Sequence, residues 1–402
     1  MPWRCGFISG RPRIDPHGDI RYRRSVSDAP IPFNRPGLVG RELEYVAEAV
    51  RVRRMSGDGA FTKRCHDLLE QHHPGSSALL TTSCTHALEM AALLLDIGPG
   101  DEVIVPSFTF VSTVNAFVLR GARPVFADVR PDTMNLDEGK LAALITPQTK
   151  AIVPVHYAGV GCEMDAIMEI ADEHAIAVVE DNAQGLFGAY RGRALGTFGA
   201  ISAVSFHETK NFHCGEGGAL FLNDRAHVAR AEIIREKGTN RSQFFRGQVD
   251  KYSWVDVGSS YLPSDLLAAF LYGQLECVDL IRRQRRAVWE RYAEGLSGWA
   301  ARQGARLPTV PAHCEQTHHM FYVLLPTLER RQAFIAHLRE AGIQSVYHYV
   351  PLHNSVMGRR FGGAQCPVTE AVSDQLVRLP FFVDLTHAEQ DRIVETISRF
   401  QV

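Results

Sequence analysis

The stretch Ser205-Phe-His-Glu-Thr-Lys-Asn-Phe-His-Cys-Gly-Glu-Gly-Gly218 decides how this chain is interpreted. It begins at the end of the apolar run 201–205, so a strand is predicted to end there and to be followed by Lys210 and a glycine-rich turn. Upstream, Val178-Val-Glu-Asp-Asn-Ala-Gln184 ends a second predicted strand in the carboxylate Asp181. A lysine and a carboxylate, far apart in the chain, therefore each follow an apolar strand.

This pair suits pyridoxal phosphate (PLP). That cofactor needs an amine to form an imine with its aldehyde, and an anion to keep its ring nitrogen protonated. Each residue also has an ordinary alternative. Lys210 could be a solvated surface lysine, and Asp181 could cap a helix after its strand. A lysine between an apolar strand and Gly215-Glu-Gly-Gly218 is not a typical surface residue, which favours the cofactor interpretation.

Short apolar runs alternate with helical patterns through the first half of the chain. This alternation predicts an α/β fold with a mostly parallel central sheet, flanked by helices on both faces. The predicted strands are 78–81, 102–106, 124–128, 151–155, 176–180, 201–205 and 219–222. In such sheets ligands bind beyond the carboxyl ends of the strands. Asp181, Ser205 and Lys210 are therefore expected at one edge of the sheet.

The pattern changes after Asp224. A long helical region is predicted over 264–296, followed by a smaller α+β unit with strands at 319–325 and 345–350 and helices at 328–341, 368–377 and 387–400. We therefore expect a large PLP-binding domain over 30–260, a connecting long helix within 261–307 and a small C-terminal α+β domain over 308–402. Residues 1–29 carry six arginines without apolar periodicity and are expected to form a disordered extension.

Composition narrows the class of protein. The chain has 402 residues, 45% of them hydrophobic and 22% charged, with a net charge of −2, which gives no signal for nucleic acid or membrane binding. None of the eight cysteines forms a C-x-x-C pair. Reduced thiols and a cytoplasmic location are expected. The pairs His72-His73 and His318-His319 lack companions at metal-ligand spacing, so no metal site is predicted.

Several motifs resemble the DegT/DnrJ/EryC1/StrS family of sugar aminotransferases. Besides the Asp181 and Lys210 stretches they are Ile31-Pro-Phe-Asn-Arg-Pro36, Pro106-Ser-Phe-Thr-Phe-Val-Ser-Thr-Val-Asn115 and His348-Tyr-Val-Pro-Leu-His353. The resemblance implies the PLP-dependent aminotransferase fold of type I. It also implies that Lys210 forms the imine and moves protons, and that Asp181 pairs with the ring nitrogen. Histidine in place of Lys210 would instead suggest the family's dehydratase branch.

Further cofactor contacts follow from the chain and from the resemblance. A predicted helix begins at Ser83-Cys84-Thr85, where free backbone N–H groups would favour the phosphate, with Thr85 adding a hydroxyl. The resemblance adds Ser205 at the phosphate, Gln184 near the phenolic oxygen and Phe110 stacked on the ring. For each residue, capping, a helix surface or the core is the ordinary alternative.

The resemblance also implies a homodimer with active sites at the interface. The family commonly supplies an asparagine from the neighbouring subunit to the phosphate, and Ser260 occupies that place here. Cations of a polar loop, Arg241, Arg246 and Lys251, are expected to reach the sugar-nucleotide diphosphate in the partner's site, although a solvated loop is an equal alternative. Two further residues, Tyr349 and His353, resemble positions near the substrate.

Longer runs, such as Glu236 to Lys251, are similar to one subgroup, the dTDP-4-amino-4,6-dideoxygalactose transaminases of enterobacterial common antigen synthesis. The expected reaction moves an amino group from L-glutamate to C4 of dTDP-4-dehydro-6-deoxy-D-glucose. Amination at C3, formation of the gluco epimer and sugar dehydration are the alternatives. A non-catalytic PLP-binding regulator is a further one, but residues 1–29 are too short and polar for a helix-turn-helix domain.

Overall fold

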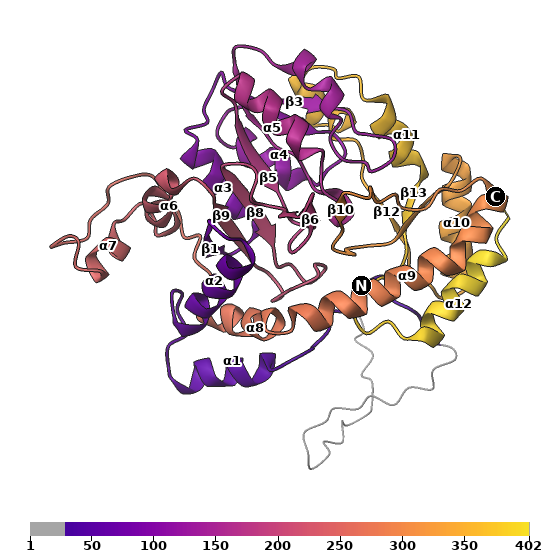
Figure 1. The fold of residues 1–402 in the computed structure, drawn as a ribbon, viewed down its shortest axis with the longest axis horizontal. Coiled ribbons are helices and arrows are strands. Elements are labelled where there is room, and N and C mark those ends of the chain that lie inside the picture. The colour runs from indigo at the N-terminus through magenta and orange to yellow at the C-terminus, as the bar shows by residue number, and fades with distance from the viewer. Residues whose placement is uncertain (1–28, 402) are drawn as a thin grey trace, which may run out of the picture.

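The computed structural model describes residues 29–401, so most of the predicted N-terminal extension lies outside the described residues. Its centre is a seven-stranded sheet in the order β1-β9-β8-β5-β4-β2-β3 (Figure 1). The strands are β1 (Ser77–Thr81), β2 (Glu102–Pro106), β3 (Arg123–Ala127), β4 (Thr149–Ile152), β5 (Ala177–Asp181), β8 (Ile201–Ser205) and β9 (Gly218–Leu222). All seven predicted strands are confirmed.

The sheet is mostly parallel, as predicted, with one reversed strand. β9 pairs antiparallel with both of its neighbours, β1 and β8, while β8, β5, β4, β2 and β3 pair parallel. The carboxyl ends of β5 and β8 therefore share one edge with the beginning of β9. Asp181, Ser205 and Gly218 meet at that edge.

Helices cover both faces of the sheet because the strand residues that point to either face are apolar. Leu79 and Val103 pack with α3 (Cys84–Leu94), α4 (Val111–Val118) and α6 (Val228–Arg235) on one face. Leu80 packs with α1 (Glu42–Arg51), α2 (Ala60–His72) and α8 (Asp265–Leu275) on the other. Ile104 contacts α5 (Met164–Glu173) on that same second face. The core of the large unit is thus two apolar layers with the sheet between them.

A smaller unit follows, built on α9 (Val278–Gln303) and a three-stranded sheet of order β11-β13-β12. Its other elements are α10 (Leu328–Glu340), β11 (Tyr322–Leu324), β12 (Val346–Tyr347), α11 (Pro367–Gln375), β13 (Leu376–Arg378) and α12 (His387–Ser398). Trp299, Phe321 and Phe334 lie in its separate core. An accessory sheet joins β10 (Cys314–Glu315), β6 (Ala189–Tyr190) and β7 (Arg193–Ala194).

Two predicted elements differ from the structure. The long helix expected over 264–296 is divided into α8 and α9 at Cys277, and α8 packs on α1 and α2 of the large unit. The helix expected over 368–377 ends at Gln375, and the next three residues form the central strand β13. A short apolar run after a helix is too short to show a periodicity, so the sequence cannot tell whether it continues the helix or forms a strand.

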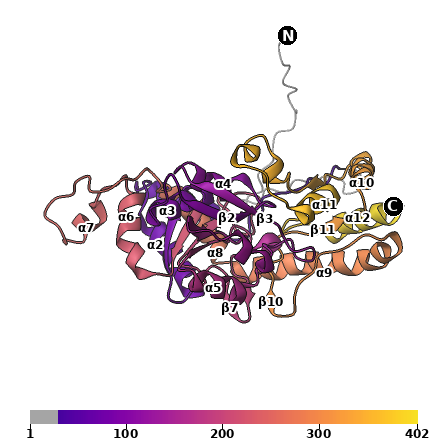
Figure 2. The same ribbon diagram turned by 90° about the horizontal axis from the view of Figure 1, so that it is seen from above.

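One segment leaves the body of the molecule. The loop around α7 (Arg241–Phe245) projects beyond α6 in both views (Figures 1 and 2). It carries Phe245, 70% exposed, and Trp254, 79% exposed. Within residues 29–401 no helix is long and apolar enough to cross a bilayer.

Candidate active site

A cavity of about 610 Å³ opens at the edge of the sheet where β5 and β8 end. This volume falls within the range of small-molecule sites, about 300–1,000 Å³. The lining brings together eight of the predicted site residues: Cys84, Thr85, Phe110, Asp181, Gln184, Ser205, Lys210 and Tyr349. The large unit supplies the first seven of them, and the small unit supplies Tyr349.

Asp181 is the last residue of β5 and is only 5% exposed. Its Oδ2 accepts a hydrogen bond of 2.7 Å from the hydroxyl of Thr113, which lies in turn 2.8 Å from the hydroxyl of Thr109. Its Oδ1 accepts from the backbone N–H of Ala183 at 3.2 Å. These donors fix the carboxylate in one orientation at the cavity wall.

Glu180, the residue before Asp181, anchors the opposite face of β5 to the loop that precedes β8. It is fully buried and accepts hydrogen bonds of 2.7 to 2.8 Å from the backbone N–H groups of Gly196, Phe198 and Gly199. His156 lies 2.9 Å from it through Nε2. Because successive strand residues point to opposite faces, Glu180 holds the strand while Asp181 faces the cavity.

Lys210 lies in the loop between β8 and β9 and lines the same cavity as Asp181. Burial lowers the pKa of Lys210 below 10.5, and the negative charge of Asp181 acts in the opposite direction. A lower pKa makes the neutral amine available as a nucleophile nearer to neutral pH. The structure thus places an activated amine and an oriented carboxylate around one cavity.

The first turn of α3 forms another part of the wall. Ser83 caps the helix by accepting a 3.1 Å hydrogen bond from the N–H of His86. The preceding N–H groups, of Cys84 and Thr85, belong to the turn in which a helix has no internal acceptor. The strand β9 approaches this turn so closely that a Cβ on Gly218 would lie 2.3 Å from the carbonyl carbon of Ser83. Only glycine allows this close packing. The N–H groups of the first turn, whose residues line the cavity, suit an anion.

Aromatic and amide side chains complete the cavity. Gln184 accepts a 2.7 Å hydrogen bond from the N–H of Ala158, and its amide nitrogen lies 3.4 Å from the hydroxyl of Tyr349. Burial raises the pKa of Tyr349 to about 12, so its hydroxyl keeps its proton. Phe110 begins α4 and remains 58% exposed, although it lines the cavity. Its ring is therefore available to a flat ligand.

Five predicted residues lie elsewhere in this single chain. Arg241 contacts Glu236 at 3.7 Å, and Arg246 makes two hydrogen bonds with Glu232 at 2.8 and 2.6 Å. Together with Lys251 and Ser260, both exposed, they lie in or beside the projecting loop and not in the cavity.

The fifth residue is His353. It is 3% exposed and lies between the hydroxyl of Ser107 at 2.6 Å and Glu370 at 3.0 Å. Both of its ring nitrogens thus have protein partners, and it does not line the cavity. Its role at the substrate stays a prediction.

The lining residues that were not predicted include Thr113, His319, His348 and Arg378. Thr113 lies four residues after Thr109 in the stretch Pro106 to Asn115, and this spacing, which brings side chains together at a helix start, was a usable signal. Arg378 was not predicted because a helix was expected over 368–377, directly before it. His348 was not predicted because it was assigned only a place in the strand 345–350.

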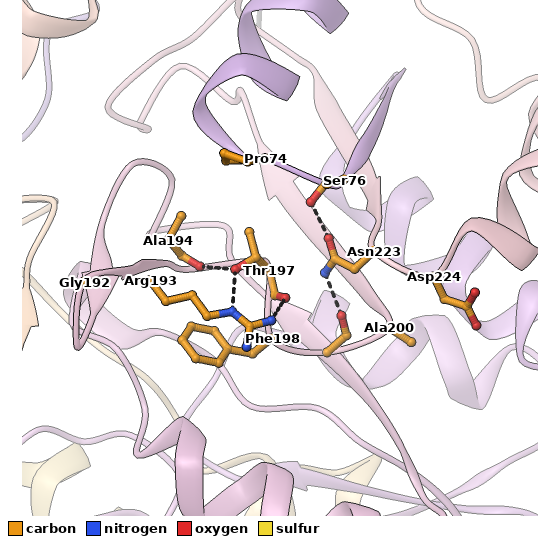
Figure 3. A pocket seen from close by; sticks show the side chains of 12 residues that line it. Pro74, Ser76, Gly192, Arg193, Ala194, Thr197, Phe198, Ala200, Asn223 and Asp224 are labelled. Atoms are coloured by element: carbon orange, nitrogen blue, oxygen red, sulfur yellow. Dashed lines mark hydrogen bonds between the residues drawn. The ribbon is translucent and has the colours of Figure 1, made fainter.

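A second hollow, of about 650 Å³, lies at the opposite edge of the sheet, where β8 begins and β9 ends (Figure 3). Its polar side chains are engaged with neighbours: Arg193 donates to Thr197, and Asn223 bonds to Ser76 and to the carbonyl of Gly199. These bonds support the loops that enter and leave the sheet. The hollow is distinct from the cavity that Lys210 lines.

Comparison with known proteins agrees with this geometry. Residues 37–398 match the model of the DegT/DnrJ/EryC1/StrS aminotransferase family. GDP-perosamine synthase of Caulobacter vibrioides is 34% identical over 94% of this chain and all of that protein. Among solved structures, the aminotransferase TlmJ of Streptoalloteichus hindustanus has a TM-score of 0.84 at 29% identity, covering 92% of this chain and 98% of that one. The putative sugar aminotransferase Spr1654 of Streptococcus pneumoniae, in its PLP form, also has a TM-score of 0.84, at 26% identity with the same coverage.

The residues of the cavity fit PLP. The backbone N–H groups at the start of α3, where Cys84 and Thr85 line the cavity, suit a phosphate. Asp181 would pair with a protonated ring nitrogen, and Phe110 would lie against the ring face. Lys210 would meet the aldehyde. Each end of the cofactor therefore has a chemically suitable partner in one cavity.

Proposed function

Because this chain belongs to the DegT/DnrJ/EryC1/StrS family of PLP-dependent sugar aminotransferases, we propose that it aminates C4 of a nucleotide-linked 4-keto-6-deoxyhexose with L-glutamate as donor. The observation that carries this proposal is the placement of Lys210 and Asp181 around the same cavity. When bound, PLP supplies an aldehyde that takes up the amino group and a ring that withdraws electrons from the reacting carbon.

The chain's own residues hold the reactants and move the proton. The carboxylate of Asp181, oriented by Thr113, maintains a positive charge at the ring nitrogen. The amine of Lys210, made less basic by burial, takes a proton from the α-carbon of the donor and returns one to the acceptor. The same amine acts in both half-reactions, so glutamate and the keto sugar are expected to show ping-pong kinetics.

The acceptor proposed first is dTDP-4-dehydro-6-deoxy-D-glucose, giving dTDP-4-amino-4,6-dideoxy-D-galactose. The support is the similarity of the loop 236–251 to the subgroup that makes this sugar. The identity to GDP-perosamine synthase favours a GDP-linked keto sugar as the second candidate. Both candidates share the same chemistry at the cavity and differ in the nucleotide.

One assay tests the function and separates these acceptors. Purified protein is incubated with glutamate and either the dTDP-linked or a GDP-linked 4-keto-6-deoxyhexose, and the product is identified by NMR. Formation of 2-oxoglutarate together with a C4 amino sugar is the expected result. Turnover of the sugar without consumption of glutamate would support the dehydratase alternative instead.

We further propose that two copies form the working enzyme. The projecting loop around α7 presents Phe245 and Trp254, which a second copy would cover. The cations Arg241 and Lys251 and the hydroxyl of Ser260 lie in or beside the same segment. In the dimer they would reach the neighbouring cavity, where the sugar nucleotide and the cofactor phosphate need donors. Free thiols at all seven described cysteines suit a cytoplasmic location.

A further inference from the structure

The helix α11 begins without a cap of its own. Its N-cap residue, Cys366, makes no side-chain hydrogen bond to the helix, and Pro367 follows at the first helical position, where it has no N–H to donate. The next two N–H groups, of Val368 and Thr369, need acceptors, as the first turn of any helix does. Both donate to the carboxylate of Asp128, which belongs to the large unit and directly follows β3. The small unit therefore takes the cap of this helix from the large one.

Asp128 binds this turn with both of its oxygens. Oδ1 accepts from the N–H and the hydroxyl of Thr369, at 2.8 and 2.9 Å, and Oδ2 accepts from the N–H of Val368 at 3.1 Å. The ammonium of Lys140 lies 3.0 Å from Oδ2. Burial alone would raise the pKa of Asp128, but the hydrogen bonds from Thr369 and Lys140 outweigh burial and lower that pKa below 3.8. The carboxylate is therefore charged at neutral pH, the form that a helix start favours.

A second contact between the units reaches the same turn. Glu370, the next residue of α11, accepts a 3.0 Å hydrogen bond from Nε2 of His353. Because Nε2 donates to a carboxylate, Nδ1 is free to accept, and it lies 2.6 Å from the hydroxyl of Ser107, which directly follows β2. The oxygen of that hydroxyl also accepts from the backbone N–H of His353 at 3.2 Å. The first turn of α11 is thus tied to the ends of two central strands, β2 and β3.

Farther along, α11 holds part of the cavity wall. One turn after Thr369, the hydroxyl of Ser373 donates a 2.7 Å hydrogen bond to the backbone carbonyl of Tyr349. The side chain of Tyr349 lines the active-site cavity, and its hydroxyl lies 3.4 Å from the amide nitrogen of Gln184. Because Thr369 and Ser373 are four residues apart in one helix, a single turn connects the cap to the cavity wall.

We propose that Asp128 is a positioning residue for amino transfer, which holds Tyr349 at the cavity by capping α11 from the large unit. This inference rests on the proposed function. Asp128 does not itself line the cavity. A helix whose first turn is bound by the other unit is held against sliding and turning, so the cap sets where Tyr349 lies relative to Gln184. A displacement of about 1 Å at a reacting site can cost about 10²-fold in rate, even when the altered residue is distant.

The competing explanation is that Asp128 only stabilises the fold, and the chain contains a matched residue for that role. Asp265 is also 2% exposed, and its Oδ1 accepts from the N–H and the hydroxyl of Thr62, at 2.8 Å each. Thr62 is the third residue of α2, as Thr369 is of α11. The Asp265 contact joins α8 to α2 within the large unit, and neither of its two residues lines the cavity. It therefore has the same chemistry without the connection to Tyr349.

The test compares Asp128→Asn with Asp265→Asn in the PLP-loaded enzyme. Each change turns one carboxylate oxygen into an NH2 group, which cannot accept a hydrogen bond, so both variants should lose a similar amount of Tm. Asp128→Asn should also lose about 10- to 100-fold in kcat/KM for glutamate, while Asp265→Asn keeps the wild-type value. The affinity for PLP should be unchanged in both, because the residues predicted to bind it lie in the large unit. Equal losses of kcat/KM in the two variants, or none in Asp128→Asn, would overturn the proposal.

Ser373 tests the route from the cap to the cavity. Ser373→Ala removes the donor to the carbonyl of Tyr349 and should lower kcat/KM about 2- to 10-fold, the effect of one neutral hydrogen bond. In the Asp128→Asn background the same change should cost less, because the helix no longer holds Tyr349 in place. Losses that simply multiply in the double variant would contradict this route.

Hydrogen exchange gives a readout that needs no reaction. In the purified full-length protein, Asp128→Asn should speed amide exchange in α11 and in residues 346–353, which carry Tyr349. Asp265→Asn should speed exchange in α2 and α8 and leave residues 346–353 unchanged. A wild-type exchange rate at residues 346–353 in Asp128→Asn would refute the positioning role.

A milder variant covers the case in which Asp128→Asn does not fold. Thr369→Val removes one donor to Asp128 and keeps the shape of the side chain, so it takes the place of Asp128→Asn in both measurements. Thr369→Ser retains the hydroxyl and should restore kcat/KM. Failure of the wild-type protein to react with glutamate would sink the proposed function, whereas hydrogen exchange would still decide whether Asp128 holds Tyr349 in place.

Discussion

The hydroxyl of Thr113 donates a 2.7 Å hydrogen bond to Oδ2 of Asp181, within a cavity that Lys210 also lines. This contact joins α4 to the end of β5. It orients the carboxylate in the cavity, where we propose that it pairs with the ring nitrogen of PLP. The strength of that ion pair therefore depends on a residue that need not contact the substrate.

Replacing Thr113 with valine keeps the shape and removes this donor. Hydrogen bonds to charged groups contribute about 1.5–3 kcal/mol, so kcat/KM for amino transfer should fall roughly 10- to 100-fold. Thr113→Ser retains the hydroxyl and should keep most of the activity. Steady-state kinetics with glutamate check this, and equal rates for the two variants would show that the contact is not used.

Lys210→Ala should abolish amino transfer, because it removes both the nucleophile and the proton carrier. General acid–base catalysis alone accounts for about 10²–10⁴-fold, so a loss of at least that size is expected. The exposed Lys63→Ala on α2 is the control and should retain full activity. Glutamate should bleach the yellow colour of the wild-type protein and leave the colour of the Lys210 variant unchanged.

The pH dependence of stability should report on Lys210. Its pKa is lowered in the folded state, so above that pKa the unfolded chain binds more protons and stability rises as pH increases toward 10.5. Lys210→Met removes the cost of burying the charge. In protein freed of cofactor, this variant should raise the Tm more at pH 7 than at pH 10. A gain in Tm that is independent of pH would contradict the assignment.

Gly218→Ala should damage both the fold and cofactor binding. The added Cβ would lie 2.4 Å from the backbone nitrogen of Cys84, so β9 or α3 must shift. Overpacking of this kind costs about 1–3 kcal/mol. Gly363→Ala, which meets nothing within 4 Å, is the matched control. Thermal unfolding measures the effect on stability, and PLP titration measures the effect on cofactor binding. A Tm and a PLP affinity equal to those of the wild type would show that β9 is not tightly packed against α3.

Mixed dimers test whether the projecting loop acts on the neighbouring copy. Lys210→Ala is co-expressed with a chain carrying Arg241→Ala and Lys251→Ala. If the loop serves the partner, one cavity of each mixed dimer regains both an intact lysine and an intact loop. Activity should then exceed that of either parent dimer. No gain after confirmed mixing would mean that the loop acts within its own chain or not at all.

The sequence predicted the large unit well because its strands are short apolar runs bounded by turns and helices. The same runs carry no sign of direction, so the reversal of β9 was not evident. Asp181 was noticeable because it ends such a run, and Lys210 because it stands between another run and a glycine-rich turn.

The small-unit side of the cavity was predicted less completely. Arg378 belongs to a three-residue strand whose pairing with β11 and β12 depends on residues far away in the chain. Local patterns cannot show such pairing. The contacts of His353 with Ser107 and Glu370 are likewise tertiary, and no local pattern distinguishes them from a substrate role.

The twelve residues between β8 and β9 start and finish on adjacent, paired strands. Lys210 is thereby tied to the same rigid body as Asp181, whereas Arg378 belongs to the other unit. A hinge rotation between the units would change the distance from Arg378 to the amine of Lys210. The residues predicted to hold PLP would keep their arrangement. A rotation that closes the cavity would therefore leave the contacts predicted to hold PLP unchanged.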